Sequence, residues 1–125
     1  MIAFPNLFSP FAVGPATFRN RIFSTGHMTC LLDDDLQPDP RFVAYHESRA
    51  RGGAGLIIME AARIHETGGH RNLDASQDSC IPGLRRVGEA VHKHGWGIFG
   101  QLGHSGVYGV TTGDGSLGVS YAPSQ

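Results

Sequence analysis

The stretch Gly97–Gly106, which reads GIFGQLGHSG, predicts the fold of this chain. It has the form of a short apolar strand that carries one amide side chain, Gln101, to its C-terminal end and then stops in glycines. Two earlier segments, Asn20–Thr29 and Gly55–Arg63, have the same form. Because ligands of parallel α/β proteins bind at the carboxyl ends of the strands, we expect these three ends to form one wall of a ligand site.

The type of side chain at position 101 indicates what such a site binds. An amide donates and accepts hydrogen bonds without carrying a charge. This chemistry suits a planar heterocycle with an imide edge. A strand-end glutamine that bonds a neighbouring loop is the alternative interpretation of Gln101 taken alone.

Two helices are predicted between the strands. Asp39 and Pro40 are typical of a helix start, with Asp39 as the N-cap, and Gly52–Gly53 is typical of a helix end. The second helix is expected to start at Pro82 and to stop at Gly95. The side chains expected to face the core are Phe42, Val43, His46 and Ala50 in the first helix, and Leu84, Val87 and Val91 in the second.

The order of these elements predicts the topology. The unbroken apolar run Gly55–Met59 is typical of a strand that is buried on both faces of a parallel sheet. The chain then alternates strand, helix, strand, helix and strand. Right-handed crossovers make this a βαβαβ unit of class α/β, with all three strand ends on one rim.

The remaining segments carry weaker signals. The alternating prolines and aromatic residues of Met1–Phe18 indicate an extended arm or a small hairpin that packs its aromatic side chains on another part of the protein. We expect loops at His65–Ser79, which is polar and has no period, and at Gly103–Gln125, which is rich in glycine, serine and threonine. The run Asp33–Asp35 is interpreted as a solvated turn in preference to a metal site.

Composition excludes several classes of protein. With 125 residues the chain can form one modest domain, whereas a closed eight-stranded α/β barrel needs roughly 250. Ten basic and eleven acidic residues, without a basic run, argue against nucleic acid as a partner. No apolar stretch approaches the roughly 20 residues of a membrane span. Cys30 and Cys80 lack metal-ligand spacing and are too few for a disulfide framework, so we expect reduced thiols and a cytoplasmic protein.

Six motifs follow one another along the chain: Leu7–Pro10, Asn20–Ile22, Tyr45 with Arg49–Ile57, Val91–Gly95, Gln101–Gly106 and Ala122–Ser124. In this order and spacing they resemble the Old Yellow Enzyme family of FMN-dependent NADH:flavin oxidoreductases. The resemblance implies a (β/α)8 TIM barrel, of which this chain supplies the N-terminal arm and about the first three strands. Within the family the sequence is most similar to the branch of 2,4-dienoyl-CoA reductase and trimethylamine dehydrogenase, whose chains continue into iron–sulfur and dinucleotide-binding portions.

The resemblance also implies a set of FMN-binding residues. The first strand end would lie along the isoalloxazine ring, Ala61 would approach the ring by its backbone, and Gln101 would hold the pyrimidine edge. Non-covalent FMN is expected, because Cys30 lies two residues beyond the position of the cysteine that anchors FMN in the amine dehydrogenases. Val107 stands where the family usually has arginine. The implied cofactor-binding residues are Thr25, Gly26, His27, Met28, Ala61 and Gln101.

The resemblance further implies that residues 1–125 are an incomplete FMN-binding barrel domain, because the family's substrate-binding pair, proton donor and phosphate-binding loops would follow Gln125. No catalytic residue and no metal site are therefore assigned. His104 is interpreted as a structural residue that ties down its loop. Three strands cannot close a barrel, so we expect the remainder of the barrel as a partner, from the same gene product or a separate chain, and an oligomer.

The expected function is transfer of hydride from NAD(P)H, through the flavin, to a small-molecule substrate with an activated alkene of the enoate or dienoyl type. Missing downstream portions are expected to hold a 4Fe–4S cluster and FAD. Three alternatives remain at this stage: an amine dehydrogenase-type flavoprotein, a catalytically incomplete or non-catalytic α/β protein that binds a partner, and a small flavodoxin-like electron carrier.

Overall fold

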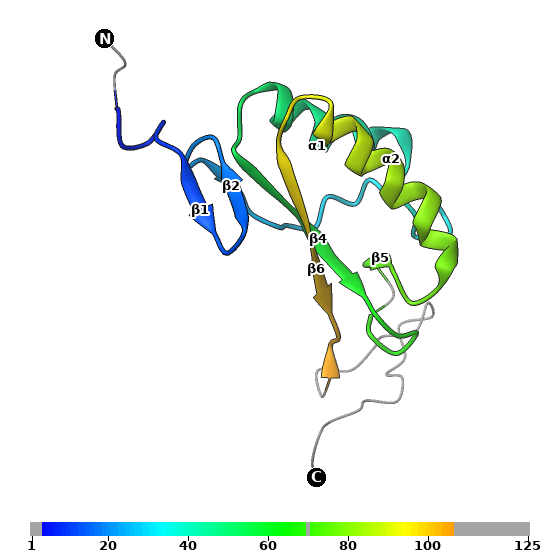
Figure 1. Cartoon of the computed structure of the whole chain (residues 1–125). Coiled ribbons are helices and arrows are strands. Elements are labelled where there is room, and N and C mark those ends of the chain that lie inside the picture. The colour runs from blue at the N-terminus through cyan, green and yellow to red at the C-terminus, as the bar shows by residue number, and fades with distance from the viewer. Residues whose placement is uncertain (1–3, 70, 107–125) are drawn as a thin grey trace.

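The computed structural model describes residues 4–69 and 71–106. Its elements follow the predicted alternation of strands and helices, and a β-hairpin precedes them in the chain (Figure 1). The expectations for Val107, for Ala122–Ser124 and for most of the final loop lie outside the described residues. The elements are β1 (Phe11–Val13), β2 (Ala16–Phe18), β3 (Phe23–Ser24), α1 (Pro40–Arg51), β4 (Leu56–Arg63), β5 (Leu73–Asp74), a 3-10 turn (Asp78–Cys80), α2 (Ile81–His92) and β6 (Gly97–Gly103).

The sheet is parallel and has β4 at its centre. Leu56 of β4 is in register with Phe23 of β3 and also with Gly97 of β6. A strand residue has one neighbour on each side, so β3 and β6 flank opposite edges of β4. The predicted βαβαβ order is thereby confirmed, with the carboxyl ends of the three predicted strands at one end of the sheet.

The prediction of a structureless loop over residues 65–79 is wrong in part. Leu73 of β5 pairs in parallel with Ala62, which also pairs with Leu102 of β6, so β5 lies on the edge of β4 that β3 leaves open beyond Ser24. A two-residue strand carries no periodic signal in a sequence. The burial of Leu73 against β4, where it is fully enclosed, is what places it.

Both helices cover one face of the sheet (Figure 1). In α1 the Asp39 carboxylate accepts a hydrogen bond from the amide of Phe42 at 2.9 Å, which confirms the N-cap. The glycine pair ends the helix as expected, with Gly53 at φ +93°. A core cluster of Ala50, Ile57 and Val91 joins the two helices to β4.

The N-terminal segment forms the predicted hairpin, because β1 and β2 pair in antiparallel fashion. Its aromatic rings pack against the start of the sheet: Phe18 lies 6.1 Å from Phe23 and 5.9 Å from Phe99 between ring centroids. Phe18 also contacts Gly97, the first residue of β6, so closely that a Cβ there would lie 2.5 Å from the ring. The hairpin therefore supports the end of the sheet opposite the strand carboxyl ends.

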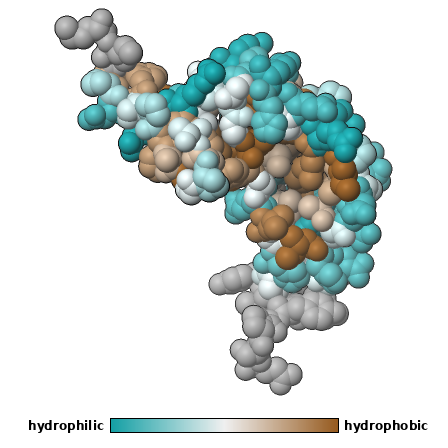
Figure 2. All heavy atoms as spheres, viewed as in Figure 1, coloured by the Kyte–Doolittle hydropathy of each residue, from teal (hydrophilic) through white to brown (hydrophobic). Residues whose placement is uncertain are grey.

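β6 is an edge strand of the described sheet and pairs with β4 on one side. Phe99 is 44% exposed and Leu102 is 70% exposed, although both belong to an apolar strand. Figure 2 shows apolar side chains at the surface along the middle of the molecule, over β4 and β6. β4 pairs with one edge of β6, and the described residues leave the side chains of Phe99 and Leu102 partly uncovered.

Candidate functional site

The carboxyl ends of β3, β4 and β6 meet at one end of the sheet. Ala61 of β4 and Gln101 of β6 are register partners, so their side chains leave the sheet side by side. Gly26 follows the end of β3 and passes over the same point: a Cβ on Gly26 would lie 2.6 Å from the Met59 carbonyl oxygen and 2.7 Å from Gln101 Oε1. The three strand ends quoted from the sequence thus converge.

A cavity of about 210 Å³ opens where these ends meet. It contains five of the six residues implied by the resemblance, whereas Thr25 is exposed outside it. Complete small-molecule pockets measure roughly 300–1,000 Å³, so the described residues form one wall of a larger site. The cavity is lined by Gly26, His27, Met28, Glu60, Ala61, Asn72 and Gln101.

The close approach at Gly26 has a cause within the protein. Contacts below 3.0 Å to a Cβ essentially never occur in proteins, and one of the two neighbours is rigid backbone. A glycine is therefore needed to let the segment after β3 cross β4 and touch the Gln101 amide. Packing within the protein therefore already requires glycine at position 26, whether or not a flat ligand lies against it.

A β-bulge in β4 shapes the pocket wall. The register with β6 shifts between Ile58 and Ala61, so Met59 and Glu60 together oppose Gly100. Bulges of this kind change the direction of the side chains beside them and are frequent next to active sites. After the bulge, both Glu60 and Ala61 line the cavity, although they are consecutive in the strand.

Glu60 was not predicted as a site residue. Its side chain is 2% exposed, and Oε2 accepts hydrogen bonds from the Thr29 amide at 2.7 Å and from the Thr29 hydroxyl at 2.6 Å. These bonds fasten the segment that follows β3 to β4. The signal in the sequence was a single acidic residue within an apolar run, since a buried carboxylate requires hydrogen-bond partners.

His27 forms the outer part of the wall with support from α1. The Tyr45 hydroxyl is hydrogen-bonded to His27 Nε2, and the two rings meet edge to face with centroids 5.4 Å apart. Arg49 stacks on the other side of Tyr45, with its guanidinium carbon 3.3 Å from the ring centroid. His27 thus lines the cavity and also packs against Tyr45.

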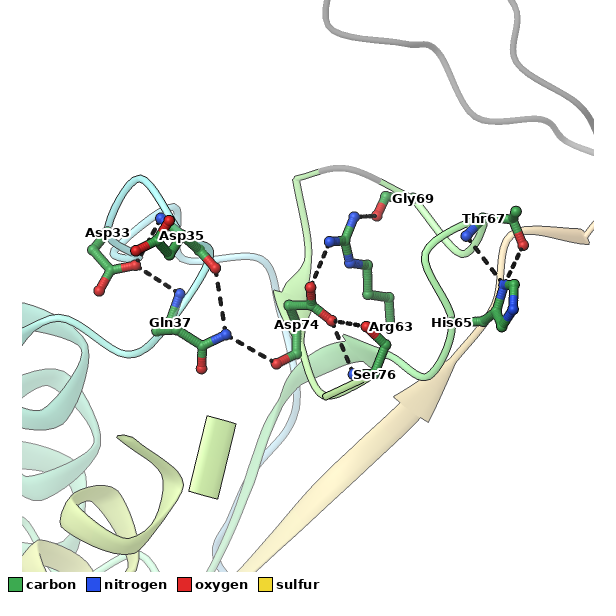
Figure 3. A network of polar contacts seen from close by, with 9 residues as sticks. All are labelled: Asp33, Asp35, Gln37, Arg63, His65, Thr67, Gly69, Asp74 and Ser76. Carbon is green, nitrogen blue, oxygen red and sulfur yellow. Dashed lines mark hydrogen bonds and ion pairs between the residues drawn. The ribbon is translucent and has the colours of Figure 1, made fainter. Parts of the chain in front are cut away.

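Asn72, the other unpredicted wall residue, comes from the loop between β4 and β5. A polar network holds this loop (Figure 3). Arg63 forms a 2.5 Å ion pair with Asp74 and donates a second hydrogen bond to the carbonyl of Gly69 at 3.1 Å. The hydrogen bond from Arg63, and then those from Ser76, hold the pKa of Asp74 well below its ordinary value, although burial opposes this.

The end of β6 is fastened to the same loop. His104 Nδ1 accepts a hydrogen bond from the Gly106 amide at 2.9 Å, so Nε2 carries the proton that it donates to the Thr67 hydroxyl, also at 2.9 Å. Ser105 donates to the carbonyl of Gly68 at 3.0 Å. These contacts match the structural role predicted for His104.

Three further observations concern metal ligands, membrane-spanning helices and the cysteines. Within residues 4–69 and 71–106, no group of three histidine, cysteine or acidic side chains is arranged to hold a metal ion, and His70 lies outside the described residues. None of the helices in the part of the chain that the structure describes is long and apolar enough to cross a membrane. Both cysteines carry free thiols.

The fold and the pocket define an α/β protein with a cavity at the carboxyl ends of its parallel strands, where ligands of such folds bind. The model of the NADH:flavin oxidoreductase / NADH oxidase family matches residues 6–120. The chain belongs to this family.

Individual relatives support the assignment. The chain is 38% identical to an NADH oxidase of Thermoanaerobacter brockii over 85% of this chain and 17% of that protein. It is 29% identical to a multifunctional alkene reductase/demethylase OYE of Caballeronia cordobensis over 80% of this chain and 15% of that one. The chain therefore spans about a sixth of the length of these relatives.

The structure of the old yellow enzyme from Trypanosoma cruzi matches with a TM-score of 0.81 and 34% identity, over 97% of this chain and 35% of that chain. The α/β fold is accordingly that of part of a (β/α)8 barrel, as the sequence predicted. The narrower placement in the branch of 2,4-dienoyl-CoA reductase and trimethylamine dehydrogenase stays a prediction.

Proposed function

We propose that the protein is an FMN-dependent oxidoreductase that transfers hydride from NAD(P)H, through the flavin, to an activated alkene of the enoate or dienoyl type. The observation that carries this proposal is the convergence of Gly26, Ala61 and the Gln101 amide on one cavity. The name of the alkene reductase relative supports the alkene as substrate.

The residues of the cavity fit a flavin. The Gln101 amide can pair with both the N–H and the carbonyl groups of an imide, and Gly26 and Ala61 present little side chain to a flat ring. The wall also holds a buried carboxylate, Glu60, whose Oε1 has no hydrogen-bond partner among the described residues. FMN, when bound, supplies the hydride chemistry, and the protein supplies binding, orientation and electrostatics.

In this proposal the chain's own residues bind and orient. Gln101 holds the pyrimidine edge, while His27 and Met28 cover the ring from the segment after β3. Met28 cannot donate a hydrogen bond, so it contributes contact and not charge. Thr25 is exposed and does not line the cavity, so its role toward FMN stays a prediction.

The proposal assigns the remaining functions to the rest of a barrel, in the same gene product or in a separate chain. The small cavity and the exposed apolar side chains of the edge strand β6 support this assignment. A cytoplasmic location, an oligomer, and a 4Fe–4S cluster and FAD in further portions stay predictions, since no described residue bears on them.

The test is the visible absorption spectrum of the purified, desalted protein, with its polypeptides sized under denaturing conditions. We expect a flavin spectrum, and we expect Gln101→Ala to weaken FMN binding about tenfold, as for the loss of hydrogen bonds to a buried ligand. Gln77→Ala is the matched control, because Gln77 is exposed and lies outside the cavity. A colourless protein that binds no added FMN would favour the non-catalytic alternative.

A further inference from the structure

Glu60 combines three properties that are found together at no other described residue. It lines the cavity, its side chain is 2% exposed, and one of its carboxylate oxygens lacks a hydrogen-bond partner among the described residues. The other residues with buried, unpartnered side-chain atoms are Gln37, His46 and Arg63, and none of them lines the cavity.

The structural contacts of Glu60 use half of its carboxylate. Oε2 accepts both hydrogen bonds from Thr29, at 2.7 Å and 2.6 Å. A neutral amide oxygen could also accept both of these bonds, although more weakly. The two bonds from Thr29 therefore account for the burial of Oε2 but not for that of Oε1. Burying an acceptor oxygen without a donor costs free energy of folding.

The neighbouring side chains set the chemistry of the missing donor. Gln101 and Asn72 each present an amide, which can donate or accept, whereas a carboxylate that is ionised can only accept. A molecule in this cavity is thus met by an unpartnered carboxyl oxygen beside two adaptable amides. We propose that Glu60 is a ligand-binding residue, whose Oε1 accepts a hydrogen bond from an N–H or O–H group of the bound molecule.

The inference rests on the proposed function, in which the bound molecule is FMN. Two groups of FMN have the required chemistry: the imide N–H of the ring and the hydroxyl groups of the ribityl chain. Both act as donors to a carboxylate, and hydrogen bonds to a charged acceptor are stronger than those between neutral groups.

Glu60→Gln tests the proposal, because glutamine retains an oxygen for Thr29 but places an NH₂ group where Oε1 was. Two donors then face each other across the contact. We expect the dissociation constant of FMN to rise about 10- to 100-fold, while the urea midpoint of unfolding falls only modestly, because the amide oxygen still accepts both Thr29 bonds, though more weakly. If Glu60 had only the structural role, the urea midpoint would fall in the same way and the dissociation constant of FMN would stay unchanged.

Thr29→Val is the matched control. It removes the hydroxyl donor to Oε2 and leaves Oε1 in place. We expect a lower urea midpoint and an FMN dissociation constant that stays within about threefold of the unmodified protein. The two variants therefore separate the anchoring contact from the ligand contact.

Binding of 3-methyl-FMN, which lacks the imide N–H, identifies the donor. Gln101 alone already makes the unmodified protein prefer FMN to 3-methyl-FMN in the proposed function. If the imide is also the donor to Glu60, Glu60→Gln reduces this preference. If a ribityl hydroxyl is the donor, Glu60→Gln weakens the binding of both flavins by the same factor.

The outcomes that contradict the two proposals are different. FMN binding that is equal, within twofold, in the unmodified protein and in Glu60→Gln would overturn the role of Glu60 and leave the proposed function intact. Failure of the unmodified protein to bind FMN would overturn both.

Discussion

Gly26 both lines the cavity and packs closely against β4 and Gln101. Its α-carbon sits between the carbonyl of the bulged residue Met59 and the amide of Gln101. A single added methyl group would push against both, and the carbonyl belongs to the central strand of the sheet. The position of the segment after β3 therefore depends on the absence of a side chain.

Gly26→Ala is expected to lower the free energy of unfolding by about 1–3 kcal/mol, as overpacking does in other well-packed sites, and to weaken FMN binding by displacing Gln101. Gly100→Ala is the matched control in β6, because its Cβ would make an ordinary 3.6 Å contact with the end of Met59. Urea denaturation and FMN titration of both variants check the prediction. Equal stability of the two variants would contradict it.

His46 is a second residue whose environment has a measurable consequence. It is 2% exposed on α1, between the rings of Phe42 and Tyr45, and neither ring nitrogen has a hydrogen-bond partner among the described residues. Burial, and then the positive charges of Arg49 and His27, lower the pKa of His46 from 6.5 to about 4. The folded protein thus keeps this imidazole neutral.

The stability of the protein is therefore expected to fall as the pH decreases from about 6.5 towards about 4. In this range the unfolded chain binds a proton at His46 and the folded chain does not. The contribution amounts to about 2 kcal/mol between pH 7 and pH 5. Urea denaturation at both pH values should show this loss in the unmodified protein and a smaller one in His46→Leu. Equal losses in the two proteins would show that His46 does not titrate as described.

At the scale of elements, β5 shows how a short strand is fixed by polar contacts. Two register pairs alone would hold it weakly, but Arg63 of β4 bonds both Asp74 and the Gly69 carbonyl. The Asp74 amide also donates to the carbonyl of Leu36 at 3.0 Å. The loop that carries Asn72 into the cavity is thereby tied at both ends.

Asp74→Asn is expected to destabilise this region by about 1–2 kcal/mol, because a charge-assisted hydrogen bond is replaced by a neutral one. The amide of Ala75, which donates to the Arg63 carbonyl, should then exchange its hydrogen faster. Lys93→Met, which removes the exposed 2.6 Å pair with Glu47, is the control and should change little. The low pKa of Asp74 also means that this contribution persists at neutral pH and declines as the pH falls below the ordinary value of 3.8. Unchanged exchange at Ala75 would contradict the role of the ion pair.

At the scale of the whole molecule, the sheet is enclosed on one side and open on the other. The helices cover one face and the hairpin supports the start of the strands (Figure 1), while the edge strand β6 exposes Phe99 and Leu102. The cavity at the carboxyl ends is likewise a single wall. The same architecture that brings the site residues together leaves both the sheet and the site to be completed by the rest of a barrel in the proposed function.

The sequence by itself determined the elements with strong local signals. The N-cap at Asp39, the glycine stop at Gly53 and the apolar run of β4 each depend on neighbouring residues, so they could be predicted without tertiary information. Strand alternation then implied the parallel order and the meeting of the strand ends. The resemblance to the Old Yellow Enzyme family implied five of the seven residues that line the cavity.

Tertiary structure alone decided the rest. Contacts between segments that are distant in the chain determine β5, the bulge before Ala61, and the positions of Glu60 and Asn72. Such contacts leave no periodic pattern in the sequence. Glu60 could be noticed as an acid in an apolar strand, but its partner Thr29 lies 31 residues earlier. Local propensity fixes which elements form, whereas the burial of polar groups, and the partners that this burial requires, is settled only when the chain has packed.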